Sequence, residues 1–108
     1  MVEKSNALTN TLVEYYKSVQ HQYPLKKMLL YGSYSKGTMQ TDSDIDIAVV
    51  MDRVPGKTRI DIMTQLFLLA GNINADIEPQ CIFWDEFINP GPASILSEII
   101  RTGKEIEV

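Results

Sequence analysis

Two aspartates alternate with isoleucines in a stretch that otherwise has the composition of a buried strand. Asp44 and Asp46 stand in the sequence Asp-Ile-Asp-Ile, which runs on into the apolar residues 47–51. Alternate residues of a strand share one face and lie about 7 Å apart, so both carboxylates would project the same way. Their mutual repulsion is relieved when both bind a hard divalent cation. The pair therefore predicts a site for an ion such as Mg²⁺.

A simpler interpretation of the same residues is a half-buried strand, with aspartate facing solvent and isoleucine facing the core. Aspartate is a poor strand former, and two aspartates on one face repel each other. A purely structural strand would more often carry threonine, lysine or arginine at these positions. We therefore favour the metal-binding interpretation of Asp44 and Asp46.

A glycine–serine pair ends another apolar run ahead of the aspartates. Gly32 and Ser33 follow residues 29–31, and Gly32 would let a phosphate approach the backbone with no Cβ in its way. The Ser33 hydroxyl and the amides around it can donate hydrogen bonds to phosphate oxygens. Because Mg²⁺ in proteins fills its octahedron with water and substrate phosphates, a phosphate loop beside an acidic pair suits a Mg–nucleotide site.

The strands that would carry these residues follow from the pattern of apolar residues and turns. Residues from about 5 to 23 have helical apolar spacing and end at Pro24, which predicts a helix. Residues 25–31 and 45–51 are short apolar runs closed by glycine or proline turns, which predicts two strands. The glycine–serine pair thus ends the first strand, and the acidic pair enters the second.

The second half of the chain alternates helix and strand. Its spacing predicts a helix over 58–72, a strand over 75–83, a turn over 84–86, a helix opened by residues 89–94 and ended before Gly103, and a short edge strand over 104–108. Thr58 is expected to cap the first of these helices. The order of elements predicts an α/β (α+β) fold, in which a small mixed sheet is covered by helices.

The helix over 58–72 carries more apolar surface than one packed face requires. Its two stripes are Ile60, Met63, Phe67 and Ala70, and Ile62, Leu66, Leu69 and Ile73. One stripe is enough for the core of a small domain. The other predicts burial against a further element or a partner, and a second copy of the chain would serve equally well.

Composition limits the classes of function. The 108 residues are expected to form one domain, over 1–108, and their net charge of −4 disfavours non-specific binding of duplex nucleic acid. The sequence has neither a signal peptide nor an apolar run near 18 residues, so we expect a cytoplasmic protein with no membrane role. Cys81, the single cysteine, is expected to be a buried thiol.

The spacing of the chemical residues matches a known pattern. Gly32-Ser33, ten intervening residues and then Asp44-x-Asp46, placed on adjacent strands, resembles the DNA polymerase β-type nucleotidyltransferase superfamily. At this length the chain is similar to the minimal nucleotidyltransferase (MNT) branch. Members often carry Ala-Arg-Gly after the glycine–serine pair, where this chain has Ser-Lys-Gly. Lys36 keeps the charge without the bidentate fork of arginine, so its implied contact with nucleotide phosphate is weaker.

The resemblance implies a polymerase beta-like nucleotidyltransferase fold and a third acid on a neighbouring strand. Asp76 and Glu78 are the candidates, and Glu78 fits the family's spacing better, ahead of an apolar run. Asp44, Asp46 and Glu78 would then be the catalytic and metal-binding carboxylates, and Gly32, Ser33 and Lys36 the nucleotide-binding residues. Two Mg²⁺ ions, about 4 Å apart, would serve transfer of AMP from ATP to an acceptor hydroxyl.

The acceptor is a separate question. An MNT chain this short resembles the antitoxin half of HEPN/MNT toxin–antitoxin pairs, which implies a tyrosine of a small helical HEPN partner as the acceptor. Two alternatives stay open. One is a small-molecule nucleotidyltransferase of the aminoglycoside-modifying type. The other is a non-catalytic antitoxin that binds its partner and acts by occlusion alone.

Overall fold

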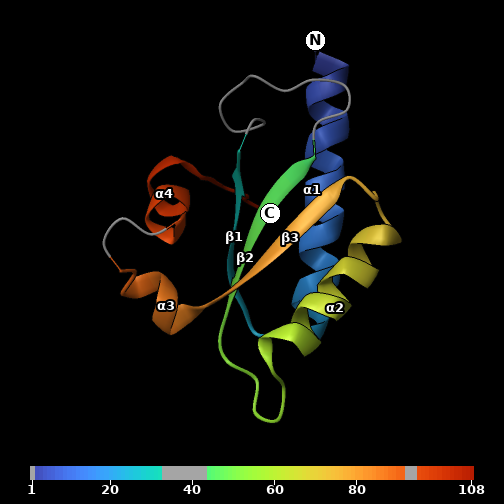
Figure 1. Ribbon diagram of the computed structural model, residues 1–108. Helices are drawn as coiled ribbons and strands as arrows, with labels where there is room; N and C mark the ends of the chain where they lie inside the picture. The colour runs from blue at the N-terminus through green and yellow to red at the C-terminus, as the bar shows by residue number, and fades with distance from the viewer. Residues whose placement is uncertain (1, 33–43, 92–94) are drawn as a thin grey trace.

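Four strands form a mixed sheet with helices on both faces. The computed structural model describes residues 2–32, 44–91 and 95–108. In chain order the elements are α1 (Val2–Gln22), β1 (Leu25–Tyr31), β2 (Ile45–Met51), α2 (Arg59–Gly71), β3 (Ile77–Phe83), α3 (Trp84–Ile88), α4 (Ile95–Thr102) and β4 (Lys104–Glu105). The strand order is β3-β2-β1-β4. The expected α/β (α+β) architecture and the two strands that flank the glycine–serine pair and the aspartates are confirmed (Figure 1).

The sheet is mixed because β2 has two kinds of neighbour. It pairs antiparallel with β1 on one side and parallel with β3 on the other, and β4 adds to the far edge of β1. A parallel neighbour requires a crossover, which α2 supplies. Thr58 caps this helix as expected, since its hydroxyl accepts from the Asp61 amide at 3.2 Å and its own amide donates to the Asp61 carboxylate at 2.9 Å.

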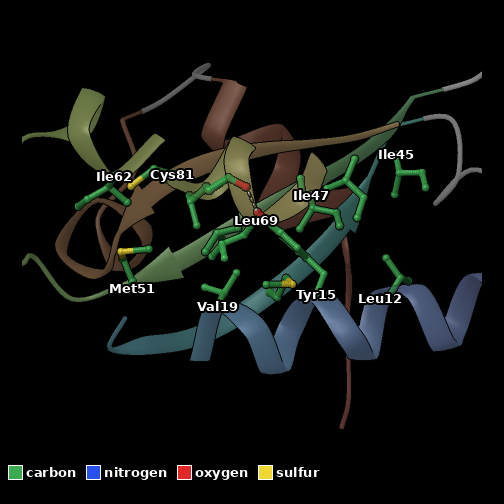
Figure 2. Packing of buried hydrophobic residues seen from close by; sticks show 14 of the residues in the cluster. Leu12, Tyr15, Val19, Ile45, Ile47, Met51, Ile62, Leu69 and Cys81 are labelled. Carbon is green, nitrogen blue, oxygen red and sulfur yellow. Dashed lines mark hydrogen bonds between the residues drawn. The ribbon is translucent and has the colours of Figure 1, made fainter. Parts of the chain in front are cut away.

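The main core lies between the sheet and the helices α1 and α2, which cover one face (Figure 1). Every second residue of β2 faces this core: Ile45, Ile47, Val49 and Met51. Tyr15 of α1 is fully buried among them, and its hydroxyl donates to the Leu66 carbonyl of α2 at 3.0 Å. Figure 2 shows how the side chains of α1 interlock with those of the sheet. Tyr15 is therefore a packing residue of the main core.

The opposite face of the sheet carries a smaller cluster beneath α3 and α4 (Figure 1). Its buried members are Leu29, Ala48, Val50, Ile82 and Ile99. Tyr31, Trp84, Phe87 and Leu96 pack against them. β2 is therefore covered on both faces, but only its Ala48–Met51 half is apolar on both.

A helix replaces the turn expected over 84–86. α3 forms because the Phe83 amide donates to the Glu86 carboxylate at 3.0 Å, and the Trp84 and Phe87 rings stack 5.5 Å apart. Arg59 stabilises the junction of β3 and α3, since its guanidinium donates to the Cys81 carbonyl at 2.6 Å and pairs with Glu86. These are contacts between distant segments, so local spacing could not indicate them.

Other boundaries move by a few residues. β3 begins at Ile77, two residues later than expected, because the Asp76 amide donates to the Asn74 side chain at 2.8 Å in a turn. The tail strand is confirmed as β4, although it is shorter than the expected 104–108. The opening of the last helix, at residues 92–94, lies outside the described residues.

α2 keeps part of its apolar surface exposed. Ile62, Leu66, Leu69 and Ala70 are buried in the core. Ile60, Phe67 and Leu68 remain 77%, 47% and 60% exposed. We call these three residues the outer face of α2. Of the first expected stripe, only Ile60 and Phe67 are exposed, because Met63 packs against the core and Ala70 lies within it. Leu68 belongs to neither expected stripe.

Cys81 is buried, as expected, and burial raises the pKa of its thiol to about 11. Within residues 2–32, 44–91 and 95–108, no helix is both long enough and apolar enough to cross a membrane.

Candidate active site

Three side chains from neighbouring strands form a row across one face of the sheet. Asp46 on β2 lies opposite Tyr31 on β1 and opposite Glu78 on β3. Residues paired in this way point to the same face, so the row places an aromatic ring and two carboxylates together. Tyr31 also packs against the apolar cluster under α3 and α4. This face of the sheet thus changes from apolar to acidic at the row.

Only glycine fits at position 32, because the backbone there lies against Asp46 of the row. Its φ of 79° lies in the left-handed region that favours glycine. A Cβ built at this position would stand 2.3 Å from Oδ2 of Asp46, closer than any side chain tolerates. The sequence prediction gave Gly32 the role of admitting a phosphate. The structure adds a second role, because the glycine makes room for the first carboxylate of the row.

Asp44 lies exposed just before β2, two residues ahead of Asp46. Its carboxyl group affects the pKa of Glu78, which is raised first by hydrogen bonding to Asp44. Loss of hydration and the charges of Asp44 and Asp46 raise the pKa of Glu78 further. Glu78 is therefore held close to both aspartates of the sequence motif.

The same negative charge affects the other members of the row. The pKa of Asp46 is raised first by partial burial and then by the charge of Asp44. The pKa of Tyr31 is raised by burial and by the charges of Asp46 and Glu78. Each group therefore holds its proton more firmly than it would alone. A bound cation would relieve this repulsion, which is the electrostatic condition expected at a metal site.

The donor set suits a hard divalent ion such as Mg²⁺, because it consists of carboxylate oxygens on one face. Among the described residues, however, no three His, Cys, Asp or Glu side chains stand where they could hold one ion together. Binding one ion through Asp44, Asp46 and Glu78 together would therefore require these side chains to move closer to one another.

The two candidates for the third acid lie in different positions. Glu78 lies within β3 and in register with Asp46. Asp76 lies before the strand, and its backbone carbonyl accepts from the Ile45 amide at 2.8 Å. The described contacts of Asp76 are thus made by its backbone, and they help to start β2 beside β3. Of the two candidates, only Glu78 is therefore in register with Asp46, and its role as the third carboxylate stays a prediction.

Two of the predicted nucleotide-binding residues, Ser33 and Lys36, lie outside the described residues. Gly32, the third, is placed beside Asp46 as described above.

Sequence reasoning missed a cleft beside the row. It has a volume of about 510 Å³ and lies between β3, α3 and α4. Its lining residues include Tyr31, Gln80, Ile82, Asn89, Leu96 and Ile99. Arg59 and Glu86, paired with each other, also contribute to its wall. Gln80 could have been found from the sequence, since it lies two residues after Glu78 and must share its face.

The fold and the acidic row together define a class of enzyme. The family described as "Polymerase beta, Nucleotidyltransferase" matches residues 13–107. The chain belongs to this family, and the expected nucleotidyltransferase fold is confirmed. A protein of Methanocaldococcus jannaschii named "Putative protein adenylyltransferase" is 43% identical over 60 residues, which are 55% of this chain. Those residues cover 59% of that relative, so the match spans less than two thirds of its length.

Solved structures show the same fold. A crystal structure of a "putative nucleotidyltransferase" from Sulfolobus solfataricus aligns with a TM-score of 0.69 at 17% identity, and the alignment covers 96% of this chain and 83% of that one. A crystal structure of a toxin–antitoxin complex with AMP-PNP aligns with a TM-score of 0.54 at 24% identity, covering 92% and 72%. A toxin–antitoxin complex named MntA–HpeT gives 0.56 at 24%, covering 91% and 70%.

Proposed function

We propose that this nucleotidyltransferase moves AMP from ATP to a hydroxyl group of a protein, most specifically a tyrosine of a small helical HEPN-type toxin, and so acts as an antitoxin. The observation that carries the catalytic part is the row in which Asp46 and Glu78 share one face of the sheet beside Gly32, with Asp44 two residues ahead of Asp46. Clustered carboxylates with raised pKa values, next to a strand-ending glycine, suit a Mg–nucleotide site.

In the proposed reaction, the acceptor oxygen forms a bond to the α-phosphorus while the bond to the β-phosphate oxygen breaks, and pyrophosphate leaves. Two Mg²⁺ ions, when bound, would neutralise the triphosphate and favour loss of the acceptor proton. Asp44, Asp46 and Glu78 would hold these ions. Gly32 lets the Asp46 carboxylate lie directly against the end of β1, where Ser33 and Lys36 follow as proposed phosphate-binding residues.

A protein acceptor is supported by two observations. The relative from M. jannaschii carries the name of a protein adenylyltransferase, and two of the similar folds occur in toxin–antitoxin complexes. The outer face of α2, formed by Ile60, Phe67 and Leu68, offers apolar surface that a protein partner could cover. A homodimer would use the same surface, so the oligomeric state should be measured along with activity.

The test uses purified protein with Mg²⁺ and ATP labelled on the α-phosphate, added to a lysate of the source cells. The variant Asp44→Asn with Asp46→Asn is the matched control, and ATP labelled on the γ-phosphate identifies phosphate transfer. We expect α-label, but no γ-label, on one small protein, and mass spectrometry should find AMP on a tyrosine. The control should show no label.

Other outcomes assign other functions. Label on a small molecule would replace the protein acceptor with one of the aminoglycoside type. No label, combined with a stable complex between the double variant and its partner that still neutralises the partner, would indicate an antitoxin that acts by occlusion. Either result would contradict protein adenylylation.

A further inference from the structure

The exposed side of α2 is apolar where a water-facing helix would carry charged residues. The three large residues of the outer face of α2 are each 47% exposed or more. The remaining exposed residues of the helix are Thr64, Gly71 and Asp61. Asp61 belongs to the helix cap, where its carboxylate accepts from the Thr58 amide at 2.9 Å. Single exposed apolar residues are common, but a contiguous row of them marks a surface that another molecule covers.

The outer face of α2 has the spacing of a helix–helix contact. Ile60, Thr64 and Leu68 follow one another at intervals of four residues, so they form one ridge along the helix. The ridge is lower in the middle, because the threonine side chain is smaller than its two neighbours. The Thr64 hydroxyl donates to the Ile60 carbonyl at 2.9 Å. The middle of the ridge can therefore lie against another helix without leaving this hydroxyl unsatisfied.

The charges of α2 fit a second copy of the same helix in the antiparallel direction. The two charged residues of α2, Arg59 and Asp61, both lie in its first turn. When two copies cross antiparallel at Thr64, each first turn lies beside the uncharged last turn of the other copy. The positive end of each helix dipole then lies near the negative end of the other. A parallel crossing would instead place Asp61 beside Asp61 of the other copy.

We propose that this chain forms a homodimer in which the outer faces of two α2 helices pack antiparallel, with Thr64 near the two-fold axis. Ile60 of one copy then meets Leu68 of the other, and the symmetry makes this contact twice. The contact is centred on one helix of 13 residues, so we expect it to bury less than the roughly 800 Å² per partner of a standard stable interface. The dimer should therefore be weak and depend on protein concentration.

The proposed dimer leaves the acidic row accessible in both copies. α2 packs on the main-core face of the sheet, whereas Tyr31 of the row packs with the cluster on the opposite face (Figure 1). Self-association thus requires neither nucleotide nor a metal ion, and it is independent of the proposed function.

The first experiment is sedimentation equilibrium of the full chain, from low micromolar to millimolar concentrations. Leu68→Glu tests the outer face, and Ile88→Glu is the matched control, because Ile88 is 61% exposed on α3 and Leu68 is 60% exposed. We expect the wild type and the control to follow a monomer–dimer equilibrium with the same Kd. Leu68→Glu should raise this Kd about 10-fold or more, because its carboxylate would lie against apolar side chains of the other copy.

A second experiment tests the antiparallel direction with a short thiol-reactive crosslinker. Ile60→Cys mixed with Leu68→Cys should crosslink much faster than either variant alone. Cys81 supplies the background thiol, and it should react slowly because it is buried with a raised pKa. Rapid crosslinking of Ile60→Cys with itself would overturn the antiparallel arrangement.

Other outcomes also contradict the inference. A wild type that stays monomeric at every concentration would overturn it, and so would a dimer that Leu68→Glu leaves intact. If the wild type is monomeric and Leu68→Glu instead breaks the complex with another protein, the outer face belongs to that partner. Nucleotidyl transfer measured on the same samples keeps the proposed function separate, because Leu68→Glu should remove the dimer and leave transfer to a small acceptor unchanged.

Discussion

The two faces of β2 carry opposite kinds of residue from one continuous stretch of sequence. Ile45, Ile47, Val49 and Met51 face the main core, where all are buried. On the other face, Ala48 and Val50 lie under α3 and α4, whereas Asp46 is only partly covered and joins the row with Tyr31 and Glu78. Adjacent residues of the strand therefore belong to different environments.

The two faces of β2 contribute with opposite sign to the stability of the fold. Burial of the isoleucine face removes apolar surface from water and stabilises the fold. The acidic end of the other face does the reverse, because partial burial and mutual repulsion raise the pKa values of Asp46 and Glu78. Destabilising charge is retained at one end of one face, which is typical of a functional site rather than of a solvent-facing strand.

The largest expected effect is on catalysis, from Asp46→Asn. We expect nucleotidyl transfer to fall by roughly 10³-fold or more, because a neutral amide cannot hold the divalent ions that offset charge on the phosphates. The free energy of unfolding at neutral pH should stay the same or rise, since a repelled charge has been removed. Steady-state kinetics and urea denaturation of the same preparation measure both. A loss of stability as large as that of a core variant would contradict the comparison.

The converse test substitutes Ile47, the next residue along β2, which faces the main core. Ile47→Ala should lower the free energy of unfolding by about 2–5 kcal/mol, because Ile47 is fully buried and a cavity replaces its side chain. The activity of the remaining folded molecules, measured at low temperature, should stay within a few-fold of the wild type. If activity per folded molecule falls as far as it does for Asp46→Asn, the two faces are not separable.

Gly32→Ala should affect both properties, since Gly32 joins the backbone of β1 to the carboxylate of the row. The positive φ alone should cost about 1–2 kcal/mol of stability for a residue with a Cβ. The new methyl group would also push the Asp46 carboxylate away, so activity should fall more than stability predicts. The control is Gly56→Ala, which also has a positive φ but has nothing near its Cβ position, and it should lose stability only.

The smallest effect is a pH dependence of stability. The fold raises the pKa of Glu78, so the folded chain holds that proton at pH values where the unfolded chain has lost it. Stability from this group is fully present below the ordinary pKa of glutamate and is lost as pH rises through the raised value. Glu78→Gln should therefore melt slightly above the wild type at pH 7, and the difference should vanish in acid. Melting curves without divalent ions, between pH 3 and 8, test this; a difference independent of pH would argue against it.

Much of the fold was predictable, because the spacing of apolar residues along the chain matches the helices and strands that form. The strands that carry Tyr31 and Asp46 were expected with their observed bounds, as was the Thr58 cap of α2. The short helix α3 could not be predicted, because five residues form no stable helix alone. It depends on Arg59, which lies more than twenty residues earlier.

The candidate site was predictable in part for the same reason. Alternation along a strand placed Asp44 and Asp46 on one face, and Asp76 and Glu78 on another strand. It could not state which of the last two lies opposite Asp46, because the register between β2 and β3 depends on how α2 crosses the sheet. The cleft could not be predicted from the sequence, since Tyr31, Gln80 and Asn89 come from three separate segments.

The parallel pairing of β2 with β3 has a consequence for the order of folding. Asp46 and Tyr31 meet by closing a hairpin, whereas Asp46 and Glu78 are about twice as far apart along the chain and meet only after α2 has crossed over. Longer closures cost more entropy and form later unless other contacts intervene. A nascent chain that has folded only as far as α2 would thus have its aspartates in place but no third carboxylate. If Glu78 acts as proposed, catalytic activity would require the pairing of β3 with β2, and a chain truncated or stalled before that pairing would be inactive.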